Sequence, residues 1–292
     1  MIAPTALVAL AEQFEILRLH CTIELQKDGN LPNFKGSMLH GWLGHALKGQ
    51  DAPLYHLFYG EHASNQPKPY FVRVANDYRQ RWHRGEMWSF EIVLLGSACR
   101  MAERLVTALV ASTPLGLGPQ RLPFNLQSIA SVLPNRLKPG LHSSQLLDWL
   151  QPVEPRLDGE IALQLHSPLR LKHKGSIIKD GIPDLSLLVQ QASRRLALLS
   201  TFWVNDNPEL LSALKHSLPY LGDYHSQGSK MYFEDWLRHS VRQNELLPFG
   251  GLMGQLCYQG DIVPAISWLQ VGEQLHIGGK TTFGLGQYQL MY

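Results

Sequence analysis

The chain has 292 residues, of which 45% are hydrophobic and 17% are charged, and its formal net charge is +2. This length suffices for two domains with cores of ordinary size, and no apolar stretch approaches the roughly 20 residues that a membrane-spanning helix needs. Because the net charge is small, the protein could bind nucleic acid only through a surface on which basic residues are concentrated. Cys21, Cys99 and Cys257 lack the spacing of metal ligands and are odd in number, which indicates free thiols. We therefore expect a soluble, cytoplasmic protein.

The first half of the chain alternates between strand and helix patterns. Residues 14–25 alternate apolar and polar side chains, which predicts a strand, and residues 37–49 have the 3.6-residue period of a helix. A buried strand over 87–96, an amphipathic helix over 97–112 and a strand over 121–133 follow. Together with a strand region between the first helix and the buried strand, this order predicts a β-α-β-β-α-β unit, the ferredoxin-like fold.

The second half repeats this order. It predicts a strand over 160–172, a long helix over 184–203, a strand pair over 230–243 and 250–261, a short helix over 264–270, and a last turn and strand over 276–292. The tripeptide Gly-Leu-Gly stands before the last predicted strand of each half, at 116–118 and 284–286, which indicates a duplicated fold.

Prolines and charge over residues 148–158 place the domain boundary there. The sequence therefore predicts an α+β protein of two tandem ferredoxin-like (RRM-like) domains, residues 1–152 and 153–292, the second carrying a C-terminal glycine-rich loop. Glycine costs backbone entropy in a strand-forming region, so we expect this loop to need positive φ or the close approach of another backbone.

The tail from His276 to Tyr292 resembles the glycine-rich signature of the CRISPR-associated repeat-processing endoribonucleases of the repeat-associated mysterious protein (RAMP) superfamily. The matching residues are Gly278, Gly279, Gly284 and Gly286, with Lys280 among them. Segments 34–48, 94–98, 167–172 and 237–261 are similar to the same family, in the same order along the chain. One feature differs, since many relatives carry a cysteine-rich insert after the first helix and residues 53–70 contain no cysteine.

The resemblance implies a protein that binds CRISPR repeat RNA, single-stranded or hairpin, and cuts it without metal or other cofactor. The 2′-hydroxyl of the RNA attacks the adjacent phosphate, leaving a 2′,3′-cyclic phosphate, while the protein supplies a base, an acid and cations. A second class stays open, a non-catalytic RNA-binding subunit of an effector or processing complex, and a third is an RNA-free scaffold. Other CRISPR-associated proteins are expected partners.

The first long helix is the predicted catalytic element. At about 100° per residue, Gly41, Gly44 and Lys48 lie opposite the apolar side chains, with His40 and His45 at the margins of that face. Each glycine costs about 1 kcal/mol relative to alanine, which the approach of RNA or of the glycine-rich loop would explain. We expect His45, and after it His40, to transfer protons, with Lys48 as a cation. Taken alone, each histidine fits an ordinary surface or boundary position, and it is the family resemblance that favours a catalytic role.

The remaining candidates form a predicted RNA track. Cations beside aromatic side chains are typical of single-stranded RNA grooves, and backbone N–H groups of a glycine-rich turn can hold phosphates. His276 either contacts RNA, acts in its chemistry, or points to solvent from a strand, and the basic cluster near residue 170 is alternatively a solvated strand end. The predicted RNA-binding residues are Arg170, Lys172, Arg238, Arg242, His276, Gly278, Gly279, Lys280, Thr281, Thr282, Gly284 and Gly286.

Overall fold

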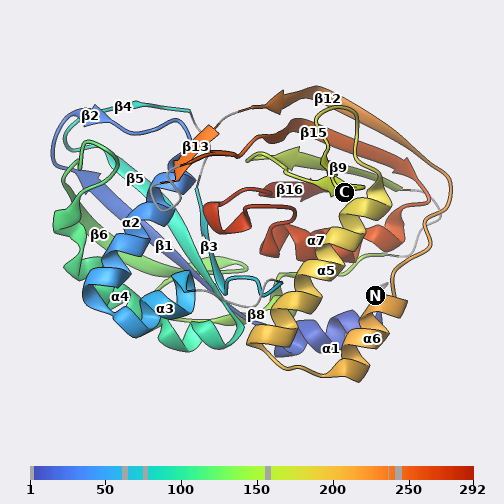
Figure 1. The fold of residues 1–292 in the computed structure, drawn as a ribbon. Helices are drawn as coiled ribbons and strands as arrows, with labels where there is room; N and C mark the ends of the chain where they lie inside the picture. The colour runs from blue at the N-terminus through green and yellow to red at the C-terminus, as the bar shows by residue number, and fades with distance from the viewer. Residues whose placement is uncertain (1–2, 61–64, 75–77, 155–158, 236, 241–244) are drawn as a thin grey trace.

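The computed structural model describes residues 3–60, 65–74, 78–154, 159–235, 237–240 and 245–292. Within these residues two antiparallel sheets lie side by side, and helices pack on each of them (Figure 1). Their elements follow one another along the chain in the order that the hydrophobic pattern predicts.

The first sheet and its helices form one strand-helix-strand-strand-helix-strand unit. Its elements are β1 (Glu15–Leu25), α2 (Lys35–Gln50), β3 (Tyr70–Arg73), β5 (Met87–Leu95), α4 (Ala102–Ala111) and β6 (Phe124–Leu133). Neighbouring strands run β3-β5-β1-β6, and β7 (Arg136–Pro139) extends the sheet beyond β6. These are the second, third, first and fourth strands of the unit, which is the ferredoxin-like arrangement.

Short elements connect these main ones. They are β2 (Gly29–Asn30), α3 (Ala52–Tyr59), β4 (Arg81–Trp82), β8 (Ser144–Gln145), and the 3-10 turns η1 (Gly96–Met101), η2 (Thr113–Leu115) and η3 (Leu146–Trp149). β8 pairs with the start of β1, and β2 pairs with β4 in a separate ribbon. The insert after α2, which lacks cysteine, thus begins with a helix of its own, α3.

The second sheet repeats the arrangement. Its unit consists of β9 (Gly159–Leu165), α5 (Leu185–Trp203), β12 (Tyr224–Glu234), β15 (Gly251–Gly260), α7 (Ile266–Leu275) and β16 (Tyr288–Met291), and the strand order is β12-β15-β9-β16. Smaller elements are β10 (Lys172–His173), β11 (Ser176–Ile177), α6 (Pro208–His216), β13 (Leu237–Ser240), β14 (Glu245–Pro248), η4 (Val263–Ala265) and η5 (Thr281–Phe283). The predicted α+β fold of two tandem ferredoxin-like domains is confirmed.

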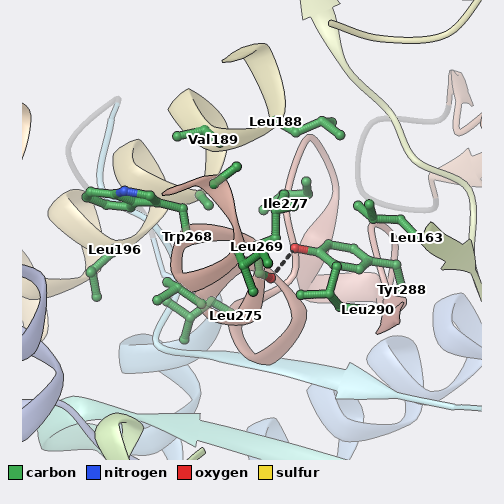
Figure 2. Packing of buried hydrophobic residues seen from close by; sticks show 14 of the residues in the cluster. Leu163, Leu188, Val189, Leu196, Trp268, Leu269, Leu275, Ile277, Tyr288 and Leu290 are labelled. Atoms are coloured by element: carbon green, nitrogen blue, oxygen red, sulfur yellow. Dashed lines mark hydrogen bonds between the residues drawn. The ribbon is translucent and has the colours of Figure 1, made fainter. Parts of the chain in front are cut away.

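The second core lies between α5, α7 and their sheet (Figure 2). Leu188 of α5 and Trp268 of α7 are fully buried there, together with Tyr288 of β16. The Tyr288 hydroxyl donates a hydrogen bond to the backbone carbonyl of Leu269, and it occupies space that a side chain at Gly272 would fill. The last strand of the chain is thereby fixed to α7, which holds both ends of the glycine-rich loop.

The two halves share one apolar interface. Ile16, Phe71 and Val93 of the first sheet belong to the same buried cluster as Leu188 and Trp268. One face of the first sheet therefore packs against α2 and α4, and the other face packs against the second half of the chain. The glycine-rich loop emerges from this interface.

The N-terminal helix α1 (Thr5–Gln13) packs with the second half of the chain. Its buried Leu7 and Leu10 lie in the shared cluster, and α1 contacts α6, as Figure 1 shows. The division of the chain near residue 152 stays a prediction.

Several element boundaries differ from the prediction. The strand predicted over 160–172 ends at Leu165, and Pro168, which has no N–H for a strand ladder, follows soon after. The strand predicted over 230–243 ends at Glu234, and residues 237–240 pair with 245–248 in a separate hairpin. The short helix predicted over 264–270 continues to Leu275, which changes the position of His276.

Candidate functional site

The glycine-rich loop follows α7 and lies against both halves of the protein. Gly278, Gly284 and Gly286 have positive φ angles of 85°, 87° and 75°. A Cβ atom would lie 2.5 Å from the Arg170 carbonyl oxygen at Gly278, and 2.8 Å from the Val72 carbonyl oxygen at Gly284. The predicted need for positive φ and for a close backbone is confirmed, and the backbone that approaches belongs to the protein itself.

Several N–H groups of the loop are used inside the protein. Gly279 donates to the Arg170 carbonyl at 2.8 Å, Gly284 to the Thr281 carbonyl at 2.8 Å, and Gly286 to the Pro168 carbonyl at 3.1 Å. These N–H groups are therefore not offered to a phosphate, and a cradle built from all the glycines is wrong in this arrangement. The glycines shape the loop instead.

The tip of the loop carries the residues that reach its surface. Lys280 is exposed, has a φ of 63°, and places its Nζ 5.3 Å from the ring centroid of Phe249. Thr282 is half-buried, whereas Thr281 is only 6% exposed. Of the polar side chains predicted at the tip, Lys280 and Thr282 are thus accessible to RNA and Thr281 is largely covered.

Helix α2 presents one stripe of residues, spaced by four, to the loop and to α3. Its apolar face at 39, 42, 43, 46 and 47 has the i, i+3, i+4 spacing that fixes the helix on the sheet. Beside that face lie Gly36, His40 and Gly44. A Cβ at Gly36 would lie 2.0 Å from the carbonyl oxygen of Phe283, and a Cβ at Gly44 would lie 3.0 Å from the Tyr59 ring.

These contacts explain why α2 has glycine at positions 36 and 44. Gly36, which the sequence analysis did not single out, receives the glycine-rich loop, and Gly44 receives the ring of Tyr59. Gly41 has no atom within 4 Å of its Cβ position, so it is the open glycine of the pair that was predicted.

The His40 imidazole lies where α2, α3, β3 and the loop meet. Its ring stacks on Phe283 with a centroid distance of 3.9 Å and an interplanar angle of 26°. Tyr59 meets it edge-on at 4.9 Å, and Tyr70 lies at 6.1 Å. The Tyr59 hydroxyl donates a hydrogen bond of 2.6 Å to the His40 carbonyl. The structure thus brings one predicted histidine to the glycine-rich loop, together with three aromatic residues that the sequence analysis did not name.

His45 and Lys48 are exposed on α2 away from this junction. Five residues separate His45 from His40, which turns their side chains about 140° apart around the helix and about 7.5 Å apart along it. Among the described residues, the side chains of His45 and Lys48 have no hydrogen-bond or ion-pair partner. Lys48 stands in the last helical turn, where a cation is favoured by the helix dipole.

His276 is fully buried at the end of α7, and its ring contacts Phe71 at a centroid distance of 4.3 Å. Burial, with the cations of Arg73, Arg195 and Arg18, holds its pKa well below the ordinary value. The two predicted positions of His276, in contact with RNA or on a solvent-facing strand, are both wrong. The physical reason is the longer α7, which makes His276 the cap of a buried helix.

The predicted basic track is only partly described by the structure. Arg170 is half-buried and donates a 2.8 Å hydrogen bond to the Gly250 carbonyl, and burial lowers the pKa of its guanidinium. Lys172 is exposed, and it belongs to the two-residue strand β10 and not to the end of the long strand predicted over 160–172. Arg238 belongs to β13, but its side chain lies outside the described residues, as does all of Arg242.

The part of the chain that the structure describes contains no group of three His, Cys, Asp or Glu side chains that could hold a metal ion. Among the same residues, no helix is long and apolar enough to cross a membrane. The three cysteines are free, and burial raises the pKa of Cys21 to about 12, which keeps that thiol protonated.

Two family models match the chain, one to each half. The model of an N-terminal domain named AF_1859_N matches residues 14–146, and the model of the CRISPR-associated endoribonuclease Cas6 matches residues 163–288. The C-terminal half of the chain is therefore similar to the Cas6 family. No curated protein matches the chain by sequence.

Solved Cas6 structures have the same fold. The chain matches a protein of a partial Cas6-RT-Cas1–Cas2 complex with 14% identity and a TM-score of 0.64, over 100% of this chain and 47% of that one. It matches a Cas6 product complex with 19% identity and a TM-score of 0.55, over 95% and 100% of the two chains. The Thermus thermophilus Cas6 matches with 14% identity and a TM-score of 0.57, over 95% and 99%. The chain therefore spans about half the length of the first protein and nearly all of the other two.

Proposed function

We propose that this chain is an endoribonuclease that binds CRISPR repeat RNA and cuts the precursor transcript into guide RNAs. The observation that carries the proposal is the position of His40, whose imidazole stacks on Phe283 of the glycine-rich loop. An imidazole next to a loop whose tip exposes Lys280 joins a proton-transfer group to a cation. The Cas6 model matched over residues 163–288 supports the RNA substrate.

The proposed reaction needs no metal ion. The 2′-hydroxyl before the scissile bond loses its proton and attacks the phosphorus, the bond to the 5′-oxygen breaks, and that oxygen takes up a proton. The products are a 2′,3′-cyclic phosphate and a free 5′-hydroxyl. We assign one proton transfer to His40, and we propose His45 as the second histidine and Lys48 as a cation for the phosphorane charge. This order reverses the sequence-based preference for His45, because only His40 stands beside the loop.

The proposed RNA path begins at the loop tip. Lys280 and Thr282 would contact the backbone near the scissile phosphate. Arg170 lies against Gly278 and Gly279 of the loop and would extend the path, with Lys172 two residues after it in the chain. Arg238 and Arg242 stay predictions for the same path. We further propose action in the cytoplasm, which the free cysteines support, and work beside other CRISPR-associated proteins.

Cleavage of the cognate repeat RNA under single-turnover conditions tests the proposal. We expect full activity in excess EDTA, a cyclic phosphate at the new 3′ end, and binding without cleavage for RNA with a 2′-deoxy nucleotide before the scissile bond. A requirement for Mg²⁺ in the chemical step would overturn the mechanism. Tight binding of intact repeat RNA with no cleavage under any condition would favour the non-catalytic RNA-binding subunit.

A further inference from the structure

We propose that Tyr59 and Phe283 are positioning residues that hold the His40 imidazole between the two domains. The inference rests on the proposed function, in which His40 transfers a proton. It adds that neither domain alone fixes this ring, because one support comes from α3 of the first domain and the other from the C-terminal loop. Gly36 and Gly44 are part of the device, since their missing side chains admit the two supports.

The support from the loop is a stacked ring with its own backing. Phe283 covers one face of His40 at 3.9 Å, and Phe249 meets Phe283 edge-on at 4.9 Å. The backbone of Phe283 comes so close to α2 that a Cβ at Gly36 would lie 2.0 Å from its carbonyl oxygen. Because this neighbour is backbone, a side chain at position 36 would displace the loop and the stacked ring with it.

The support from α3 is both a ring and a hydrogen bond. Tyr59 lies edge-on to His40 at 4.9 Å, and its hydroxyl donates to the His40 carbonyl at 2.6 Å. Tyr55 stacks on Tyr59 with an interplanar angle of 4°, which keeps the Tyr59 ring in place. The ring reaches α2 over Gly44, four residues after His40 as Gly36 is four before it, so both glycines lie on the face of His40.

Phe283 and Tyr59 together form a clamp on the His40 ring. Such a clamp affects the rate of RNA cleavage more than it affects the affinity for RNA. A proton-transfer group must be held to about 0.5 Å of its productive position, and a displacement of about 1 Å can cost about 100-fold in rate. An unsupported imidazole on a helix surface samples several side-chain rotamers. Losing either aromatic support should therefore slow the chemical step while leaving the phosphate contacts of the RNA intact.

The test compares Phe283→Leu and Gly44→Ala with Phe283→Tyr and Gly49→Ala in the full chain. Leucine removes the stacked ring, and alanine at position 44 pushes against Tyr59. Tyrosine at 283 keeps the ring. Gly49→Ala is the matched helix control, because a Cβ there has no atom within 4 Å. Alanine favours a helix over glycine, so Gly44→Ala should fold even if Phe283→Leu does not.

Three quantities are measured for each variant. They are the single-turnover cleavage rate, the affinity for the 2′-deoxy RNA, and the NMR shifts of the His40 ring protons, assigned by comparison with His40→Ala. Phe283→Leu and Gly44→Ala should cut about 10- to 100-fold more slowly, with affinity within about 3-fold. Phe283→Leu should also move the His40 ring protons downfield, because the stacked ring no longer shields them. Phe283→Tyr and Gly49→Ala should behave like the wild type.

The outcomes separate this inference from the proposed function. Wild-type rates in Phe283→Leu and Gly44→Ala, with His40→Ala inactive, would overturn the clamp and leave the proposed function standing. An unmoved His40 spectrum in Phe283→Leu would also overturn the clamp, whatever the rates. Full activity in His40→Ala would overturn the assigned role of His40, and the positioning role would fall with it.

Discussion

The two Gly-Leu-Gly turns of the molecule stand at the same place in the two domains and contact different partners. Residues 116–118 precede β6, and residues 284–286 precede β16. In the first turn, a Cβ at Gly116 would lie 2.3 Å from the carbonyl oxygen of Arg121, in the same turn. In the second, a Cβ at Gly284 would lie 2.8 Å from the carbonyl oxygen of Val72, in the other domain. One tripeptide thus closes a turn locally and, in its second copy, joins two domains.

The residue before each tripeptide shows what this difference means for function. Each turn begins with a short 3-10 segment, η2 or η5, which ends at Leu115 or Phe283. Leu115 is 42% exposed, whereas Phe283 stacks on His40. Leu115 and Phe283 therefore occupy equivalent positions in the two turns. Of these two residues, only Phe283, whose turn crosses the domain interface, contacts the candidate catalytic histidine.

The largest expected effect is on the histidine that the second turn supports. His40→Ala should slow single-turnover cleavage of the repeat RNA by about 10²–10⁴-fold, the usual worth of a positioned acid or base. Its affinity for the uncleavable 2′-deoxy RNA should stay within a few-fold of the wild type, because the change acts on the chemical step.

His45→Ala is the matched variant on the same helix, and we expect it to lose less rate than His40→Ala. If His45→Ala loses the larger factor, the glycine-rich loop does not mark the catalytic histidine, and the functional difference between the two turns disappears.

A glycine in each turn provides the second comparison. Gly284→Ala and Gly118→Ala both place alanine at positive φ, where the wild-type angles are 87° and 68° and the strain costs about 1–2 kcal/mol. Only at Gly284 does the new Cβ also meet a backbone atom, since the nearest atom to it at Gly118 is Sδ of Met38 at 3.3 Å, which can move.

Gly284→Ala should therefore destabilise the protein more, as measured by urea unfolding. It should also cut about 10-fold more slowly because Phe283 moves with the loop. Gly118→Ala should keep its cleavage rate within about 3-fold after its lower stability is allowed for. Equal rates in the two variants would show that the second turn has no special link to the site.

The sequence predicted the element order and the two turns because both depend on local patterns. The alternation over 14–25, the helical period over 37–49 and the repeated tripeptide are all contained within short segments. The site was less predictable, because it forms where distant segments meet. His40 and Phe283 lie 243 positions apart in the sequence, and no local pattern around either residue predicts that their rings stack.

Two other parts of the site show why residue identity alone was insufficient. Tyr59 comes from an insert whose lack of cysteine was noted and whose helix α3 was not predicted. A strand is one of the positions predicted for His276, because the predicted helix before it stops at residue 270. The five additional helical residues carry His276 into the core. The four-residue spacing of Gly36, His40 and Gly44 is the sequence signal that matches the observed contact face, whereas the predicted face of Gly41, Gly44 and Lys48 leaves Gly36 out.

The third prediction concerns the buried start of the second turn. Ser112 caps helix α4 before the first turn, whereas His276 caps α7 before the second, and burial holds the pKa of His276 well below its ordinary value of 6.5. Below pH 6.5 the unfolded chain binds a proton at this residue that the folded chain does not. The free energy of unfolding should therefore fall as the pH drops, by at most about 1.4 kcal/mol per pH unit from this group.

Urea unfolding between pH 7.5 and 5.5 checks this sign. His276→Leu should have a smaller loss of stability over that range than the wild type, whatever its stability at pH 7.5. His45→Ala, which removes an exposed histidine, serves as the control and should follow the wild-type pH dependence. An unchanged pH dependence in His276→Leu would contradict the assignment.

The smallest expected effect is on RNA affinity, and it compares one cation from each turn. Lys280 and Arg121 are both non-glycine residues at positive φ, 63° and 48°, beside their respective Gly-Leu-Gly tripeptides. Alanine at either position keeps the same backbone strain and removes one positive charge.

If Lys280 contacts a phosphate of the RNA, Lys280→Ala should weaken binding about 2- to 5-fold. It should also reduce the slope of log affinity against log salt by about 0.7, the value for one contact to a single strand. Arg121→Ala should leave both quantities unchanged, because its turn closes within the first domain. A salt titration of the two variants with the 2′-deoxy RNA decides the matter, and equal losses would mean that the RNA senses net charge alone and does not distinguish the two turns.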